Sequence, residues 1–419
     1  MNSVVEKILI VDDNATNLQV LYKTLNQDSY KIYIAKNGLD AIAITRKIKP
    51  ALILLDIMMP EMDGYETCEK IREDESLHDI AIIFLSALDE PVNKVKGLQL
   101  GAVDYITKPF QADEVLARIK IHLKIKNLEK DLKTRNKELE NFKNTIAKDL
   151  DAASRVQKSL LPTMSPMVAN ARFAWAYRPS TVLAGDSLNY VQLNSRFIAL
   201  FLLDVSGHGV ASALLSVSVS RAISQFRDPS SLIVRMEPDG VTIACPNDVA
   251  KRLNHLYPMM SNGAHYFTMV YGLLDLQKLQ FRFVTAGHPG PILVRRGGDS
   301  QFFDIASFPI GVVENPEYED HILQLEPGDR LYMYSDGIYE AKKEETKEEF
   351  GRTRMLNALK AASFLPLNSS IDALLEKTQE WHGQDSFTDD VSVLAIEIPQ
   401  NATIISHEED SPEAMRIDI

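Results

Sequence analysis

The sequence contains very little cysteine, since Cys68 and Cys245 are the only two among 419 residues. Two cysteines are too few for the disulfide frameworks of small secreted domains, so a reducing compartment is expected. Long apolar runs are also missing: none approaches the roughly 20 residues that a membrane-spanning helix needs. No basic segment followed by an apolar leader opens the sequence. These features predict a cytoplasmic protein with no membrane partner.

Positive charge is scarce relative to negative charge. The 45 Lys and Arg residues stand against 58 Asp and Glu residues, which gives a formal net charge of −13. Nucleic-acid binding needs clustered Lys and Arg to contact phosphates, so we expect no nucleic-acid partner. The hydrophobic fraction of 45% and the charged fraction of 25% are typical of a globular protein. The length predicts two or three domains.

Short apolar runs alternate with amphipathic segments over residues 1–123. This alternation predicts a doubly wound, five-stranded parallel sheet, an α/β fold. Chemistry in such sheets gathers at the carboxyl ends of the strands. Helices are expected between the strands, one of them over 91–100. The predicted strands are KILIV (7–11), IYIA (32–35), ALILLD (51–56), IAIIFLSA (80–87) and DYITKPF (104–110).

Polar residues follow or end four of these predicted strands. Asp12 and Asp13 follow the first strand, Asp56 ends the third, and Ser86 and Lys108 lie at the last two. Carboxylates gathered at one place repel each other unless a divalent cation lies among them, and oxygen ligands suit Mg²⁺. A carboxylate beside Mg²⁺ can accept a phosphoryl group, which a lysine and a hydroxyl can then bind.

The motifs VDD, LLDIMMPEMDG, LSA and TKPF resemble those of bacterial response-regulator receiver domains over about residues 5–123. The resemblance implies that Asp56 accepts a phosphoryl group from a histidine kinase or a phosphotransfer protein. It also implies that Asp13, Asp56 and the carbonyl of Met58 hold Mg²⁺, with Asp12 acting mainly through water. By the same resemblance, the residues that respond to phosphorylation are Ser86, Lys108 and the switch aromatic Tyr105.

Glycine and proline are absent from Gln111 to Leu160, and Pro162 and Pro166 end this segment. Its apolar residues recur mostly every three or four positions, which predicts a long amphipathic helix. We expect the helical linker, 124–165, to form a coiled coil and a homodimer, with an irregularity near 146–150. Packing of this helix on its own domain is the alternative.

Residues 166–400 consist of many short alternating apolar runs and few helical segments. This pattern predicts a β-rich sandwich covered by helices. Helices are expected over 210–226, 246–257, 351–362 and 368–382. Examples of the predicted strands are FIALFLLDV, YFTMVYGLLDL, LQFRFVTAG, PILVRR, RLYMYSDG and VSVLAIEI. The last residues, 401–419, include HEEDSPE and are expected to form a solvated, disordered acidic tail.

No Ser-His-Asp or Cys-His set accompanies the carboxylates of this second region, and no CxxC or histidine cluster indicates zinc. Two divalent ions can bridge a water, lower its pKa and bind a phosphoryl group without a protein nucleophile. Glycines beside the carboxylates let the backbone turn closely around such ions. We therefore predict a two-metal hydrolytic site. Its candidate residues, all near predicted strand ends, are Asp186, Asp204, Asp336, Asp389 and Asp390.

The motifs GD (185–186), DVSGHG, AGHPGP, YSDGIYEA and DDVSV resemble the protein phosphatase 2C superfamily, and more narrowly its sporulation stage II protein E branch, over about 166–400. The resemblance implies an α/β/β/α sandwich and two Mn²⁺ or Mg²⁺ ions. Asp204 would bridge both ions, with Asp186 and the Val205 carbonyl completing one site. Asp336 and Asp389, preferred over Asp390, would complete the other.

The sequence departs from that branch at two positions. Ser187 replaces a usual aromatic residue, and Asn189 replaces a frequent acidic residue, which could weaken metal affinity. His208 either assists proton transfer or has a structural role, and His288 is expected to be a turn residue.

Together these features predict a response regulator whose output is a phosphoserine or phosphothreonine protein phosphatase. Phosphorylation of Asp56 would control it through the linker helix. The resemblance implies that its substrate is an anti-sigma factor antagonist in a partner-switching pathway. The alternative is a non-catalytic adaptor, in which the receiver gates partner binding by a phosphatase-like scaffold. Retention of the matched aspartates favours the enzyme.

Overall fold

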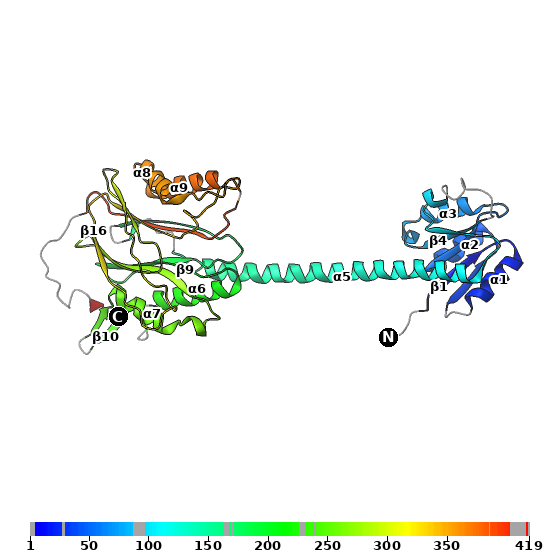
Figure 1. The fold of residues 1–419 in the computed structure, drawn as a ribbon, viewed down its shortest axis with the longest axis horizontal. Helices are drawn as coiled ribbons and strands as arrows, with labels where there is room; N and C mark the ends of the chain where they lie inside the picture. Colours follow the sequence, from blue (N-terminus) through cyan, green and yellow to red (C-terminus); the bar gives the residue numbers. More distant parts are fainter. Residues whose placement is uncertain are drawn as a thin grey trace. The chain divides into compact units, whose positions relative to one another are not determined.

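The chain folds into two compact units, Met1–Asn144 and Thr145–Ile419. The computed structural model describes residues 5–26, 30–86, 97–162, 167–168, 171–225, 231–237, 240–384, 386–402 and 416–417. Figure 1 traces the elements of each unit along the chain. Most of the helix expected over 91–100 lies outside the described residues, and only 97–99 of it are described as helical.

The first unit contains a five-stranded parallel sheet in the order β2-β1-β3-β4-β5. This order confirms the predicted doubly wound fold. All the side chains of β3 and β4 are buried, because helices cover both faces of the sheet. The strands are β1 (Lys7–Val11), β2 (Lys31–Ala35), β3 (Leu52–Asp56), β4 (Ala81–Ser86) and β5 (Asp104–Thr107).

Polar side chains begin the helices that follow the first three strands. Asn14, Asn37 and Asp63 each accept a hydrogen bond from a backbone N–H of the first helical turn. These caps fix where the chain turns from strand to helix, and so place the strand-end carboxylates beside them. The elements are α1 (Ala15–Leu25), α2 (Gly38–Ile48), α3 (Gly64–Arg72) and the short 3₁₀ helix η1 (Glu75–Leu77).

A single helix, α5 (Ala112–Lys158), spans 47 residues. Its first turns pack on the receiver sheet through Val115, Ile119 and Leu123. Further along, large apolar side chains remain exposed on α5, including Leu128, Leu132, Leu139 and Phe142. Near its end Ser154 and Gln157 are buried again. The predicted long helix is therefore present, and its middle part presents an uncovered apolar stripe.

The second unit is built on two antiparallel sheets, one of five strands and one of six. The five-stranded sheet runs β16 (His321–Gln324), β13 (Gln280–Ala286), β12 (Phe267–Asp275), β9 (Phe197–Val205) and β8 (Ser187–Gln192). The six-stranded sheet runs β15 (Ser300–Phe302), β14 (Ile292–Val294), β17 (Arg330–Tyr334), β18 (Val391–Glu397), β7 (Ala171–Arg178) and β6 (Met167–Val168).

Three apolar clusters order these sheets and their helices into layers. One cluster, which includes Leu202, Phe281 and Leu394, lies between the two sheets. A second joins the five-stranded sheet to α6 (Val210–Ser224) and α7 (Pro246–Leu256), and a third joins the six-stranded sheet to α8 (Gly351–Ala361) and α9 (Leu367–His382). Figure 1 shows these helix pairs on the two outer faces. The result is the expected α/β/β/α sandwich.

Two smaller features complete this unit. A 3₁₀ turn, η2, covers Met259–Ser261, and a three-stranded sheet joins β10 (Val234–Glu237), β11 (Gly240–Ile243) and β19 (Arg416–Ile417). Within the expected acidic tail, Arg416 and Ile417 form a strand that pairs with β11, which corrects the expectation of disorder for these two residues. The rest of the tail beyond Ala402 lies outside the described residues. Throughout the described ranges, no helix has both the length and the apolar character needed to cross a bilayer.

Candidate phosphoryl and metal sites

An acidic cluster lies at the carboxyl edge of the receiver sheet. Ligand atoms of Asp12, Asp13 and Asp56 all lie within 4.8 Å of one another. Asp12 and Asp56 are buried, and Asp13 is exposed to solvent. Backbone and side-chain N–H groups of Asn14 and Asn17 hold the Asp12 carboxylate. The fold thus brings together the three carboxylates, as their positions at the strand ends predicted.

Lys108 compensates part of this negative charge. Its Nζ lies 2.9 Å from Asp12 Oδ2 and 2.8 Å from Asp56 Oδ2. Burial alone would lower the pKa of Lys108, but the hydrogen bonds to both carboxylates outweigh burial and raise it. Burial raises the pKa of Asp56, and the contact with Lys108 opposes that rise. One lysine against three carboxylates leaves room for a cation.

The other receiver candidates surround Asp56. The Met58 N–H donates to Asp56 Oδ1 at 3.4 Å, which places the Met58 backbone beside the carboxylate. Ser86 ends β4, and its buried Oγ has no hydrogen-bond partner within the described residues. Tyr105 lies on β5, half-buried, with the Arg118 guanidinium 5.8 Å from its ring centre.

In the second unit, each candidate carboxylate stands at the end of a core strand. Asp186 immediately precedes β8, and Asp204 is the penultimate residue of β9. Asp336 follows β17 by two residues, and Asp389 and Asp390 immediately precede β18. Because β8 and β9 are antiparallel neighbours in one sheet, as are β17 and β18 in the other, these ends meet in pairs.

Two glycines allow the backbone to approach closely around these carboxylates. A Cβ at Gly185 would lie 2.8 Å from the Val205 carbonyl oxygen, and one at Gly337 would lie 2.2 Å from the Asp390 carbonyl oxygen. Contacts this short exclude a side chain at either position. The turn that carries Asp186 therefore lies directly against the Val205 carbonyl, the predicted backbone ligand.

The carboxylates repel one another strongly. Burial, together with the charges of Asp336 and Asp389, raises the pKa of Asp204 to about 7. Burial and the charge of Asp389 raise the pKa of Asp336 to about 6. Complete burial and the neighbouring Asp204 raise the pKa of Asp186 well above its usual value. Asp186 Oδ2 also has no hydrogen-bond partner among the described residues.

Asp389 and Asp390 differ in what their side chains do. Asp390 is buried, and its carboxylate accepts hydrogen bonds from Ser180 N and Oγ and from Gly185 N, at 2.8, 2.9 and 2.7 Å. It therefore holds the turn that positions Asp186. Asp389 is exposed, and its charge acts on Asp204 and Asp336.

Gln157, near the end of α5, contacts the same region, and the predicted site residues do not include it. Its Nε2 donates to the Ala184 carbonyl at 2.7 Å, and its Oε1 accepts from Ala184 N at 3.2 Å. Asn189 Nδ2 donates to the Leu160 carbonyl at 3.0 Å, so this residue is linked to the chain that follows α5. In the sequence, Gln157 and Leu160 lie in the segment VQKSLLP (156–162), which ends the long helical segment at Pro162.

The two histidines have different settings. His208 is exposed in the loop after β9. Partial desolvation of the Asp389 carboxyl group by its surroundings raises its pKa although the residue reaches solvent, and the interaction with His208 opposes that rise. His288 is buried in the turn after β13, where burial lowers its pKa to about 4, so the ring is neutral. Its Nδ1 lies 2.9 Å from the Pro289 carbonyl oxygen.

Comparison with known families agrees with this architecture. Residues 8–120 match the family "Response regulator receiver domain", and residues 194–399 match the family "Stage II sporulation protein E (SpoIIE)". A curated relative, the probable transcriptional regulator ycf27 of Porphyra purpurea, is 44% identical over 115 residues. That match covers 27% of this chain and 46% of the relative, so the chain spans about half the length of the curated relatives that it matches.

Solved structures resemble each part separately. The SiaA-PP2C domain of Pseudomonas aeruginosa is 21% identical with a TM-score of 0.51, and covers 61% of this chain and 98% of that chain. At this identity the likeness shows the fold. A putative response regulator from Chloroflexus aurantiacus J-10-fl is 31% identical with a TM-score of 0.28, and covers 29% of this chain and 98% of that chain. The chain therefore matches the receiver family in its first unit and the SpoIIE family in its second, which has a PP2C-like fold.

Proposed function

We propose that this protein is a response regulator whose output is a metal-dependent phosphoserine/phosphothreonine protein phosphatase. The observation that carries the proposal is the carboxylate cluster at the strand ends of the SpoIIE PP2C-like domain. A receiver domain attached to a phosphatase domain supports phosphoryl-controlled hydrolysis. We place its action in the cytoplasm.

The carboxylates of the second unit suit divalent cations. Asp186 carries a buried oxygen without a partner among the described residues, and the pKa values of Asp186, Asp204 and Asp336 are raised. A cation would give the Asp186 oxygen a ligand contact and would reduce the repulsion among the carboxylates.

We assign the two Mn²⁺ or Mg²⁺ ions to the residues of the predicted set. The ligands would be Asp186, Asp204, the Val205 carbonyl, Asp336 and Asp389. Because the Asp390 carboxylate already accepts three hydrogen bonds, we give it a positioning role. When bound, such ions activate water and neutralise phosphoryl oxygens. The chain contributes a preorganised set of carboxylates, and His208 lies near Asp389 at the solvent side.

In the receiver we assign Asp56 as the phosphoacceptor. Asp13, Asp56 and the Met58 carbonyl would hold Mg²⁺, with Asp12 acting through water. Lys108 already contacts the Asp56 carboxylate, and its ammonium group could bind an oxygen of a phosphoryl group attached there. The Ser86 hydroxyl has no partner in the described structure, so it is available to a phosphoryl oxygen. Movement of Ser86 and Tyr105 on phosphorylation is part of this proposal, and the donor would be a histidine kinase or a phosphotransfer protein.

The signal would travel through a dimer of α5. Its exposed apolar residues lie three, four or seven positions apart, the spacing of a coiled-coil seam. A change of helix pairing would reach Gln157, which holds Ala184 two residues before Asp186. The mechanism is then a shift between two helix arrangements. The seam residues are Ile121, Ile125, Leu128, Leu132, Leu139, Phe142 and Ile146.

The substrate class proposed is a phosphorylated protein, specifically an anti-sigma factor antagonist in a partner-switching pathway. This assignment rests on resemblance to the SpoIIE branch. The competing proposal, a non-catalytic adaptor, requires that the carboxylates serve no reaction, and their raised pKa values disfavour it because burying repelling charges without use is costly.

The test is Mn²⁺-dependent hydrolysis of an aryl phosphate and of a phosphoserine protein. Asp204→Ala and Asp336→Ala should each lose activity by about 100-fold or more while retaining their fold, since they remove metal-site charge. Asp372→Ala, an exposed aspartate on α9, is the matched control and should be unaffected. An inactive wild type, with and without beryllofluoride, would favour the adaptor.

A further inference from the structure

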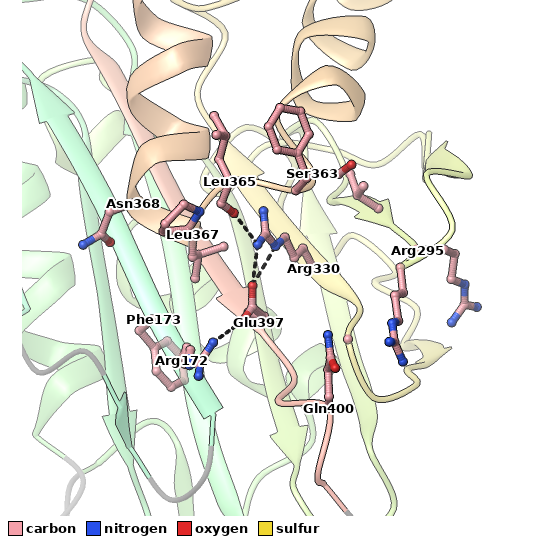
Figure 2. Close-up of a pocket in the computed structure, with 15 residues that line it drawn as sticks. Arg172, Phe173, Arg295, Arg330, Ser363, Leu365, Leu367, Asn368, Glu397 and Gln400 are labelled. Carbon is pink, nitrogen blue, oxygen red and sulfur yellow. Dashed lines mark hydrogen bonds and ion pairs between the residues drawn. The ribbon is translucent and has the colours of Figure 1, made fainter.

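A basic cavity lies at one end of the six-stranded sheet, away from the carboxylates. Its volume is about 630 Å³, within the range of small-ligand sites. Figure 2 shows Arg172 and Arg330 both reaching Glu397 in this cavity, with Arg295 to one side. Arg296 also lines it. Four arginines and one carboxylate are an unusual lining on a chain whose net charge is −13.

Strand register builds the floor of the cavity. Val294, Arg330, Glu397 and Arg172 are direct cross-strand neighbours on β14, β17, β18 and β7. Because they form one row, their side chains lie on the same face of the sheet. Arg330 alternates with Tyr332 and Tyr334, which pack against α8 and α9, so this face is the helix-covered one.

The ion pairs around the cavity do not neutralise all four of its arginines. Glu397 accepts from Arg172 at 2.8 Å and from Arg330 at 2.6 Å, and Arg295 pairs with Asp329 and lies 4.0 Å from Glu326. The four arginines therefore face three carboxylates. Arg296 is exposed and makes no ion pair or hydrogen bond through its side chain within the described part of the chain. Its stem packs over Gly328, where a Cβ would lie 2.9 Å from Arg296 Cδ. Arg172 also keeps free donors, because its side chain is 58% exposed.

The first turn of α9 opens into the same cavity. Pro366 is its N-cap residue and offers no side-chain hydrogen bond, and the first turn contains no acidic residue. The N–H groups of the first turn, at Leu367 and Asn368, have no partner within the helix. Both residues line the cavity. The positive end of a 16-residue helix therefore adds to the charge of the arginines.

An aromatic side chain stands at the cavity. Phe364 lines it and is 82% exposed, a large apolar ring left in water. Arginine forks and helix N–H groups suit phosphate, and an uncovered ring suits a planar base. We propose that this cavity binds a nucleotide, with phosphates on Arg172, Arg296 and the first turn of α9, and the base against Phe364.

This nucleotide site is separate from the phosphatase centre. Arg330 begins β17 and Asp336 follows its far end, while Glu397 ends β18 and Asp390 precedes its start. Six or seven residues of extended strand span about 20 Å. A nucleotide bound here is therefore an effector carried on the same two strands that position the carboxylates, and does not occupy the hydrolytic site.

The test is calorimetric binding to the full-length protein in EDTA, which keeps nucleotides from being held through metal at the carboxylates. The probes are adenosine and guanosine mono-, di- and triphosphates, with adenosine, pyrophosphate and a polyglutamate peptide for comparison. At least one nucleotide should bind with a Kd below about 1 mM. Arg296→Ala should weaken it about tenfold, the loss of one charge-assisted contact.

Matched variants separate the parts of the proposal. Phe364→Ala should weaken nucleotide binding but leave the affinity for pyrophosphate unchanged. Arg221 is an exposed arginine on α6, and Arg221→Ala should leave both affinities unchanged. The proposal is overturned if no nucleotide binds, if Arg296→Ala has no effect, if pyrophosphate binds as tightly as every nucleotide, or if only the acidic peptide binds.

Discussion

The side-chain amide of Gln157 hydrogen-bonds to both backbone groups of Ala184. Nε2 donates to the Ala184 carbonyl at 2.7 Å and Oε1 accepts from the Ala184 N–H at 3.2 Å. All of these groups are buried. Since Ala184 stands two residues before Asp186, the last turns of α5 are coupled directly to a candidate metal ligand.

Gln157→Ala should loosen that turn. It leaves a buried N–H and a buried carbonyl unpaired, which costs about 1–3 kcal/mol of the free energy of unfolding. The Mn²⁺ concentration needed for half-maximal activity should rise, because the Asp186 carboxylate is less well placed. Lys158→Ala, one residue along and exposed, is the control. Identical Mn²⁺ dependence and stability in the two variants would show that the contact does not support the site.

Thermal stability of the metal-free protein should fall as pH rises from about 5 to 8. The pKa of Asp336 is about 6 and that of Asp204 about 7, both above their ordinary value of 3.8. The folded state therefore binds more protons than the unfolded state in this range, and that stabilisation is lost as pH rises through the folded pKa values.

Added Mn²⁺ should reverse this trend, raising the melting temperature much more at pH 8 than at pH 5, because protons and metal compete for the same carboxylates. Scanning calorimetry with EDTA or Mn²⁺ at each pH measures both effects. Asp204→Asn should flatten the metal-free pH dependence. An equal Mn²⁺ effect at both pH values would argue against metal binding by these groups.

Leu132→Lys should dissociate the proposed dimer. Leu132 is 60% exposed in the middle of the α5 stripe, and a lysine there would be buried against its counterpart in a coiled coil. Light scattering coupled to size-exclusion chromatography measures the molar mass and so distinguishes dimer from monomer. Thr134→Lys adds the same charge two residues away on the polar side and should leave the mass unchanged. A wild-type monomer at all concentrations would remove the dimer from the account.

Lys108→Ala should uncouple the receiver from the phosphatase. It removes the cation between Asp12 and Asp56, and so the group that would bind a phosphoryl oxygen on Asp56. Beryllofluoride should then no longer change the phosphatase rate, while the Mn²⁺-dependent basal rate persists. Lys124→Ala, on the exposed side of α5, serves as the comparison. A full response in Lys108→Ala would exclude this role.

Strand-end carboxylates could be predicted from the sequence because they follow local patterns. Asp12 and Asp56 each follow a short continuous apolar run, which is typical of a buried strand. A parallel sheet brings the carboxyl ends of such strands to one edge. The five-stranded parallel sheet, the long helix and the helix-covered β-sandwich were predicted from the same kind of periodicity, and the structure confirms them.

Contacts set by tertiary packing could not be predicted in this way. Gln157 and Ala184 are 27 residues apart, and no local signal joins them. Arg172 and Arg330 meet at Glu397 only because the register of β7, β17 and β18 aligns them. Likewise, only the fold shows that the Asp390 carboxylate is occupied by Ser180 and Gly185.

The phosphatase rate of the full-length protein in Mn²⁺, with and without beryllofluoride, tests the central claim most directly. Asp56→Asn is the necessary comparison, and Asp113→Asn, at the exposed start of α5, is the matched control. The account predicts that beryllofluoride changes the rate of wild type and of Asp113→Asn, and leaves Asp56→Asn unchanged. Equal rates with and without beryllofluoride in the wild type would contradict control of the phosphatase by the receiver.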